Sequence, residues 1–291
     1  MPIEDPCIFC GSAGERDVRA GRFLALPDDG PYAVYRCRPC AYGWLSPVVS
    51  ADHQERLYDR SYFDPAAAGC AYQLKVKELL ACFERRAGRF KASAPNTHIL
   101  DVGCATGEFM NLARKIGLEV TGLDISAYAC EVCRSNGFPV IQGDIFSSQL
   151  LPQSFGGLHA SHVLEHFAQP VDAVRRLHQL LAPGGVLYLE VPYQFDSWLD
   201  RLNARRNRLS IYPQWSLHHR SFFSPRSLGR LLQQSGFDIL HQTTFLACHR
   251  QLRPPGPRKW SQQIFLWLAD KLARKGDLIS VWAKKGVPPD V

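Results

Sequence analysis

Short apolar runs and helical spacings alternate through the middle of this 291-residue chain. The clearest unit begins with the apolar run at residues 99–102, which stops abruptly at Gly103 and Gly107 before helical spacing resumes. Glycine permits backbone conformations and close approaches that a Cβ would block. The pattern therefore predicts a buried strand that turns tightly into a helix.

The same alternation continues on both sides of this unit. Apolar spacing predicts a helix at 71–90, and Ser126 is the expected N-cap of a helix that stops at Gly137. Further strands are expected at 22–26, 32–36, 119–125, 138–142, 157–161, 186–191, from 236 onward and at 278–283, and further helices at 170–181, 198–209, 225–235 and 260–275. Such alternation is typical of a doubly wound α/β sheet with its ligand at the C-terminal ends of the strands.

The turn after residues 99–102 carries the pattern Asp101-x-Gly103-x-Ala105-x-Gly107. A dinucleotide fingerprint starting at Gly103 would need glycine at positions 105 and 108, where the chain has Ala105 and Glu108. The Gly-Lys-Ser/Thr of a phosphate-binding P-loop is also missing. The turn is therefore either a nucleotide-type site of another kind or an ordinary strand–turn–helix without a ligand.

Two Cys-x-x-Cys pairs, Cys7/Cys10 and Cys37/Cys40, lie near the N-terminus. Each pair presents two thiolates to one ion, and two pairs complete a tetrahedral zinc site. Four thiolates leave no open coordination position, so the expected zinc is structural, and residues 1–48 are predicted to form a zinc ribbon. The alternatives are a cysteine-rich terminus that has lost its metal and a redox pair; the redox pair is disfavoured because neither pair opens a βαβ unit.

Composition narrows the class of protein. A hydrophobic content of 46% suffices for a packed core, and a formal charge of +7 permits an anionic substrate without demanding nucleic acid. The arginines of the ribbon are scattered among acids, which argues against a nucleic-acid partner. No 18-residue apolar run predicts a membrane span, and the acidic N-terminus does not resemble a signal peptide. Ten cysteines without an export signal favour thiols and metal, and hence a cytoplasmic location.

Several motifs together resemble one family. The pattern at 101–107 resembles motif I of class I S-adenosylmethionine (SAM)-dependent methyltransferases, commonly D/E-x-G-x-G-x-G. Gly-Asp-Ile at 143–145 resembles the third cofactor motif of that family, His-Val-Leu-Glu-His at 162–166 resembles its signature after the fourth strand, and 219–224 resembles an H-x-x-x-F-S/T element. The core is similar to ubiquinone-biosynthesis-type O-methyltransferases, and the ribbon with the His-x-x-x-Phe element to bacterial sugar and natural-product methyltransferases.

The resemblance implies an α/β, Rossmann-like fold with a seven-stranded sheet, whose last strand is inserted antiparallel, and a small N-terminal zinc ribbon. The expected organisation is a ribbon at 1–48, a linker and helix at 49–97, and a methyltransferase domain at 98–291 with a lid insertion at 192–219. Known sugar C-methyltransferases of this kind carry a further C-terminal domain, which has no counterpart here, so the acceptor stays open. The oligomeric state is not predicted.

The resemblance also implies a set of cofactor-binding residues. All of them lie at the ends of predicted strands. Those around the turn are Asp101, Gly103, Cys104, Ala105 and Gly107. Asp124 is expected to bind the ribose hydroxyls, Ile125 and Ile145 to flank the adenine, Asp144 to bind the adenine amino group, and His162 to lie near the methionine end.

Methyl transfer to a hydroxyl or a carbon acid benefits from a base, and histidine has a pKa near working pH. His219 is the favoured candidate, with His166 and His218 behind it. The expected function is SAM-dependent transfer of a methyl group to oxygen or carbon of a small molecule, for example an anionic sugar or natural-product intermediate. The alternatives are a SAM-binding enzyme that performs cyclisation or alkyl transfer, and a non-enzymatic zinc-ribbon adaptor with a relic fold.

Overall fold

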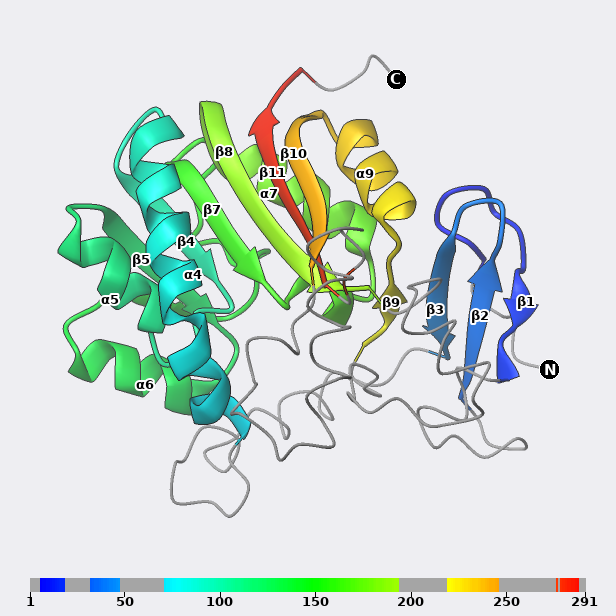
Figure 1. Ribbon diagram of the computed structural model, residues 1–291, viewed down its shortest axis with the longest axis horizontal. Helices are drawn as coiled ribbons and strands as arrows, with labels where there is room; N and C mark the ends of the chain where they lie inside the picture. Colours follow the sequence, from blue (N-terminus) through cyan, green and yellow to red (C-terminus); the bar gives the residue numbers. More distant parts are fainter. Residues whose placement is uncertain are drawn as a thin grey trace, which may run out of the picture.

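The computed structural model describes residues 6–18, 32–47, 71–193, 219–245, 276 and 278–287, with side chains omitted at 71–78. Its main body is a seven-stranded sheet in the order β10-β11-β8-β7-β4-β5-β6 (Figure 1). The strands run over β4 His98–Val102, β5 Glu119–Asp124, β6 Val140–Gln142, β7 Phe155–Ser161, β8 Leu181–Pro192, β10 Phe237–Phe245 and β11 Leu278–Lys285.

Strand direction in this sheet follows the expectation. The strands β8, β7, β4, β5 and β6, in this order across the sheet, pair in parallel. Strand β11 pairs antiparallel with both β8 and β10. The seven-stranded sheet with its last strand inserted in reverse is therefore confirmed. Because the parallel strands point the same way, the C-terminal ends of β4, β5, β6 and β7 meet at one edge.

Helices cover both faces of the sheet (Figure 1). They are α4 Ala71–Ser93, α5 Glu108–Lys115, α6 Ala127–Ser135, α7 Pro170–Leu180 and α9 Pro225–Gln234, with a short 3-10 helix η2 at Leu164–His166. Alternate residues of β8 face opposite layers: Tyr188 packs with Phe90 of α4 and Phe109 of α5, whereas Leu187 packs with the cluster that includes Val174 of α7. Residues buried on both faces explain why the parallel strands read as continuous apolar runs.

Helix ends are set by local chemistry. The Ser126 side chain accepts a hydrogen bond from the backbone N–H of Ala129, which confirms the expected N-cap of α6. Ser224 and Ser227 form a capping box at the start of α9, with Pro225 at the first helical position.

A second sheet lies beside the first and has the order β1-β2-β3-β9. Its strands are β1 Glu15–Arg16, β2 Ala33–Cys37, β3 Tyr42–Ser46 and β9 Ser221–Phe222. The first three belong to the predicted ribbon, but β9 comes from far along the chain and pairs antiparallel with β3 (Figure 1). The strand pattern of the sequence did not predict this fourth strand.

Several expectations fall outside the described residues: the strand at 22–26, the linker at 49–69, most of the insertion at 192–219, and the helix at 260–275. The proposed domain boundaries stay predictions. In α4, Cys82, Ala87 and Phe90 are buried and Phe83 packs against the same cluster, whereas Leu80 is 38% exposed. Among the described residues, no helix has the length and apolar character needed to cross a membrane.

Candidate cofactor and acceptor site

The turn between β4 and α5 lies at the C-terminal edge of the sheet. Its backbone is left-handed at Gly103 (φ 69°), Ala105 (φ 48°) and Gly107 (φ 88°). The N–H groups of Gly103 and Cys104 both donate to the carbonyl of Leu123 on β5, at 2.8 and 3.1 Å. The glycine motif therefore folds back over the neighbouring strand in a conformation that side chains rarely adopt.

Gly103 is exposed on this turn, and a Cβ there would lie 2.6 Å from the Val163 side chain. Glycine is thus required both for the backbone conformation and for space. Cys104, another residue of the predicted cofactor site, has its side chain turned away from the turn. Its thiol is buried against Gly122, where a Cβ would lie 2.7 Å from the sulfur, so only the backbone of Cys104 faces the turn.

Asp124 ends β5 beside this turn. One carboxylate oxygen accepts from the N–H of Ala105 and the other from the N–H of Ser126, both at 2.9 Å. Burial raises the pKa of Asp124, and these two hydrogen bonds oppose that effect. Each carboxylate oxygen keeps a further lone pair, so the side chain can still accept hydrogen bonds from a diol.

Apolar surface is uncovered at the ends of β5 and β6. Ile125 is 37% exposed and Phe146 is 51% exposed, with the exposed Asp144 between them in sequence. Ile145 is 0% exposed and packs in the core, so the expectation that it contacts the adenine is corrected. Phe146, whose N–H donates to the carboxylate of Asp144 at 2.9 Å, offers its ring instead.

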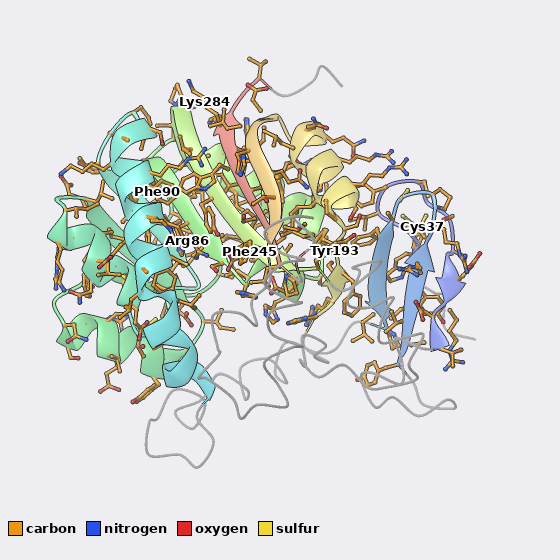
Figure 2. All side chains as sticks on the ribbon, in the orientation of Figure 1. Cys37, Arg86, Phe90, Tyr193, Phe245 and Lys284 are labelled. Atoms are coloured by element: carbon orange, nitrogen blue, oxygen red, sulfur yellow. The ribbon has the colours of Figure 1, made fainter. Side chains whose placement is uncertain are left out.

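A buried polar chain lies beneath the turn. Asp101 Oδ1 and His159 Nδ1 are 2.7 Å apart, and Arg86 Nη1 lies 3.3 Å from His159 Nε2. Burial lowers the pKa of His159, and its partners assign a neutral ring that donates to Asp101 and accepts from Arg86. Arg86 continues the chain to Glu190 of β8 at 2.6 Å; Figure 2 shows Arg86 on α4 directed at the sheet. The chain of contacts thus links Asp101 of β4 through β7 and α4 to β8.

His162 follows β7 in a left-handed conformation (φ 58°), with 42% of its side chain exposed. Its ring nitrogens lie 3.4 Å from a carboxylate oxygen of Glu165 and 3.4 Å from one of Glu190. Burial alone would lower the pKa of His162, but the two carboxylates raise it to about 9. The structure therefore places a cationic imidazole at the edge of the sheet where the methionine end was expected.

His166 and His219 come together although 52 residues separate them in sequence. Their ring centroids are 4.9 Å apart. Glu165 is 1% exposed and lies beneath both, and the N–H of Arg220 donates to its backbone carbonyl at 2.8 Å. Two of the three predicted base candidates thus share one site; the third, His218, lies outside the described residues.

The ligand atoms of Glu165, His166 and His219 all lie within 4.8 Å of one another. Two histidines and a carboxylate can hold a divalent metal ion. They can equally serve proton transfer, because a carboxylate that orients an imidazole fixes its tautomer and stabilises its protonated form. Burial alone would raise the pKa of Glu165, but the surrounding histidines lower it, so its carboxylate stays ionised beneath them.

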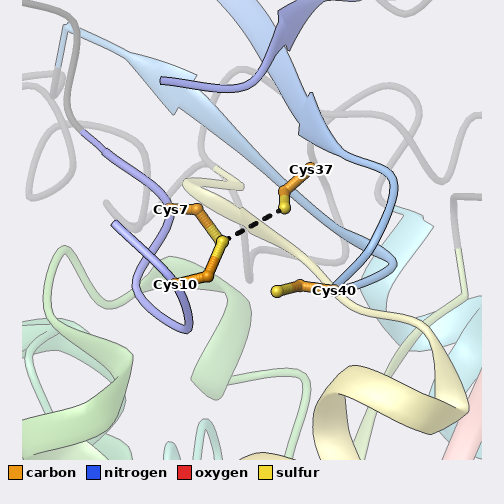
Figure 3. Close-up of side chains that lie close together, drawn as sticks. All are labelled: Cys7, Cys10, Cys37 and Cys40. Carbon is orange, nitrogen blue, oxygen red and sulfur yellow. Dashed lines mark hydrogen bonds between the residues drawn. The ribbon is translucent and has the colours of Figure 1, made fainter. Parts of the chain in front are cut away.

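The four ribbon cysteines converge on one point (Figure 3). The sulfur atoms of Cys7, Cys10, Cys37 and Cys40 lie within 4.8 Å of one another, and Cys10 and Cys37 are 3.6 Å apart. Sulfur atoms around one tetrahedral zinc ion are about 3.8 Å apart, given Zn–S bonds of about 2.3 Å. The N–H of Gly11 donates to the carbonyl of Cys7 at 2.8 Å, which shapes the first knuckle. The predicted tetrad can therefore hold one metal ion.

Sequence reasoning missed Arg86, Glu190 and Phe146. Arg86 follows Phe83 by three residues and precedes Phe90 by four, so a charge lay on the predicted apolar face of the helix. Glu190 stood inside an apolar strand run. Either charge was a signal for a buried pair, because an isolated charge is too costly to bury. Phe146 gave no signal that distinguished it from Ile145.

Comparison with known proteins agrees with this geometry. A family model described as a methyltransferase domain matches residues 70–242. The ubiquinone biosynthesis O-methyltransferase of Pseudomonas aeruginosa (strain LESB58) is 25% identical over 157 residues, covering 51% of this chain and 68% of that protein. The protein of that name from Serratia proteamaculans (strain 568) is 31% identical over 138 residues, covering 45% of this chain and 57% of that protein.

A solved structure shares the fold. It is a chain from a complex between the Haloferax volcanii Trm112 methyltransferase activator and the protein described as its methyltransferase, with a TM-score of 0.53, 13% identity, and coverage of 72% of this chain and 93% of that chain. The matched domain, the strand order and the glycine turn lead to one conclusion: the chain belongs to the class I SAM-dependent methyltransferases.

Proposed function

We propose that this methyltransferase transfers a methyl group to an oxygen or carbon atom of a small-molecule acceptor, with His219 as the base. The meeting of His166 and His219 over the buried Glu165 carries the proposal. It places a pair of imidazoles and a carboxylate near the strand edge that holds the cofactor turn. The relatives are named as O-methyltransferases, which favours oxygen as the accepting atom.

The cofactor residues fit SAM. The left-handed turn at Gly103 has no side chain there, so a ligand can approach the protein backbone closely. Asp124 offers lone pairs to the ribose hydroxyls, and Ile125 and Phe146 offer apolar surface to the adenine. Asp144 is exposed next to Phe146, from whose N–H it accepts a hydrogen bond, and its carboxylate suits the adenine amino group. When bound, SAM supplies an electrophilic methyl group on a positively charged sulfur.

His219 would take the proton that the acceptor hydroxyl loses when it is methylated. S-adenosylhomocysteine is the other product, and the proton is left on the imidazole. Glu165 stabilises that charge and, with His166, keeps the ring oriented. General-base catalysis of this kind contributes about 10²–10⁴-fold, while positioning of the acceptor contributes the rest.

The acceptor itself is proposed to be anionic. The insertion at 192–219 carries four arginines together with Trp198, Tyr212 and Trp215, and arginine forks suit phosphate and carboxylate groups. A nucleotide-linked sugar or a carboxylated metabolite has this chemistry. The insertion lies mostly outside the described residues, so its role as a lid stays a prediction.

The four-cysteine ribbon is proposed to bind one structural Zn²⁺. All four ligands are thiolates, which is the closed donor set of structural zinc and leaves no position for substrate. The zinc would then act on the stability of the ribbon and take no part in the chemical step.

The test begins with SAM binding by calorimetry. Wild-type protein should bind SAM, and Asp124→Asn should weaken binding by about 1.5–3 kcal/mol, the scale of hydrogen bonds to a charged group. Asp172→Asn, which changes an exposed acid on α7, is the matched control and should bind as wild type. An unchanged dissociation constant for Asp124→Asn would show that the ribose lies elsewhere.

The second step screens acceptors with SAM and identifies products by mass spectrometry. Methylated acceptor and S-adenosylhomocysteine are expected, and His219→Asn should lower kcat by about 10²–10⁴-fold while SAM affinity stays unchanged. Release of methylthioadenosine would instead indicate non-methylating chemistry. Failure to bind SAM at all would favour the adaptor hypothesis.

A further inference from the structure

The sheet of the ribbon is completed by a strand of the methyltransferase chain. Gly43 and Trp44 of β3 pair antiparallel with Phe222 and Ser221 of β9. The N–H of Leu45 also donates to the carbonyl of Arg220 at 3.0 Å. Figure 1 shows β9 between β3 and the main sheet. The segment that directly follows His219 is therefore an edge strand of the ribbon.

Side chains fasten this strand pairing. The Tyr42 hydroxyl and the Ser221 hydroxyl are 2.8 Å apart and buried. The Tyr42 ring also packs against Phe223, with centroids 5.6 Å apart, and Phe222 and Phe223 are fully buried. Tyr42 follows Cys40 by two residues on the same hairpin. One hairpin thus carries a cysteine pair on its turn and the contacts to β9 on its second strand.

Helix α9 reaches the cysteine cluster from the methyltransferase side. Arg230 Nη1 lies 3.7 Å from the Cys40 sulfur, and Nη2 lies 3.4 Å from the carbonyl oxygen of Phe9. The guanidinium also lies over the Phe9 ring, 5.4 Å from its centroid. A divalent ion with four thiolates has a net charge of −2, so a cationic donor beside one sulfur stabilises it. Arg230 contacts both knuckles.

We propose that the metal-bound ribbon is a positioning device for the acceptor site. β3 holds β9, β9 fixes His219 beside Glu165 and His166, and Arg230 stabilises the thiolate cluster in return. Tyr42, Ser221 and Arg230 are positioning residues, because none of them contacts the proposed reacting atoms. The proposal rests on the proposed zinc site and on His219 as the base. Coupling of this kind is reciprocal, so a substitution that weakens the contacts between β3 and β9 should also weaken metal binding by the ribbon.

The first test measures metal release. Full-length zinc-loaded protein is mixed with a chromogenic chelator, and the release rate is followed by absorbance. Arg230→Ala should release zinc about ten-fold faster, since loss of an outer-shell partner costs about 10–100-fold in metal affinity. Arg226→Ala, which removes an exposed arginine from the same helix, is the control and should match wild type. Equal release rates for the two variants would overturn the role of Arg230.

The second test asks whether the metal acts on His219. Imidazole resonances are assigned by comparison with His219→Gln and followed as the chelator removes zinc. The His219 resonance should shift, kcat should fall several-fold, and the dissociation constant for SAM should stay constant. Tyr42→Phe removes one hydroxyl and keeps the ring, so it should shift the same resonance with zinc still bound.

If the His219 resonance is unchanged in both cases, the ribbon does not position it and the proposal is wrong. The protein could instead bind SAM, show the shift of the His219 resonance and methylate none of the acceptors. That result would support the positioning role of the ribbon and contradict the proposed function. The zinc content of wild-type protein is measured before these tests. Protein without zinc would contradict the zinc site itself, and with it the positioning role of the ribbon.

Discussion

Ala105 is the one position where the cofactor turn departs from the commonest form of its motif, and it is also strained. Its φ of 48° lies in the left-handed region, which costs an L-residue about 1–2 kcal/mol. Its N–H nevertheless donates to Asp124 at 2.9 Å, so the turn keeps its shape with a methyl group in place of a hydrogen. The hydrogen bond and the neighbouring glycines hold the backbone there.

Replacing Ala105 with glycine should therefore remove strain. Glycine also gives the unfolded chain more conformational freedom, and this offsets about 0.4–1 kcal/mol of the stability gained by removing the strain. We expect Ala105→Gly to raise the free energy of unfolding by up to about 1 kcal/mol. Ala113→Gly, inside α5 with ordinary helical backbone, should lower it by about 1 kcal/mol or more. Chemical denaturation of both variants checks the prediction; equal losses would show that the turn is not strained.

His162 gives the site a pH-dependent contribution to stability. Its pKa is raised from the ordinary value of about 6.5 to about 9 by Glu165 and Glu190. A raised pKa in the folded state means that the stabilisation is fully present below about pH 6.5 and is lost as pH rises through about 9. The half-exposed ring keeps the effect modest.

The measurement compares wild type with His162→Gln between pH 6 and 10. Wild type should be the more stable protein at pH 6, and the difference in free energy of unfolding should shrink as the pH approaches 10. A difference that is constant across this range would mean that His162 is neutral in the folded protein.

At the scale of elements, a buried arginine joins helix α4 to the sheet in addition to the apolar contacts of Phe90. Arg86 pairs with Glu190 of β8 at 2.6 Å and lies 4.3 Å from the centroid of the Tyr188 ring. The Tyr188 hydroxyl donates to the same carboxylate at 2.7 Å. Glu190 is 1% exposed, and its pKa is lowered because Arg86 and His162 outweigh the effect of burial. The pair thus fixes the position of α4 over β8 and holds a carboxylate for His162.

Arg86→Ala should lower the free energy of unfolding by about 3–5 kcal/mol, because it leaves a buried carboxylate without its main counter-charge. Arg89→Ala is the matched control on the same helix. Arg89 is exposed and lies over the Trp282 ring, a contact worth about 0.5–1 kcal/mol. Urea unfolding separates the two variants, and similar losses would contradict the importance of the Arg86–Glu190 pair.

At the scale of the whole molecule, two sheets share one apolar core. Tyr42 and Trp44 of the ribbon belong to the same buried cluster as Phe223, Leu228 and Leu231. A ribbon alone has little core, and small domains of this kind depend on a metal for stability. Here the ribbon gains a strand and an apolar partner from the methyltransferase chain.

Purified protein should contain about one zinc per chain, because the four sulfur atoms suit one tetrahedral ion. Cys37→Ser should lose the zinc and destabilise the ribbon while SAM affinity stays near wild type. Elemental analysis and calorimetry provide the two readings. Freshly prepared protein with four free thiols and no metal would refute the zinc site.

The sequence by itself determined the local units. Glycine spacing predicted the turn at 103–107, Ser126 predicted a helix start, and the two cysteine pairs predicted converging knuckles. These features depend on residues a few positions apart, so periods of 2 and 3.6 residues and turn chemistry suffice to predict them. The family resemblance added the number of strands in the main sheet and the reversed direction of the last one.

Only the tertiary structure decided which distant segments meet. It paired β9 with β3, brought His219 to His166, turned Ile145 into the core and Phe146 outward, and buried Arg86 against Glu190. No local pattern encodes these contacts, since each depends on how loops close and how layers pack. The conformation of the glycine turn thus follows largely from residues close together in sequence, whereas the proposed acceptor site depends on contacts between segments far apart in the chain.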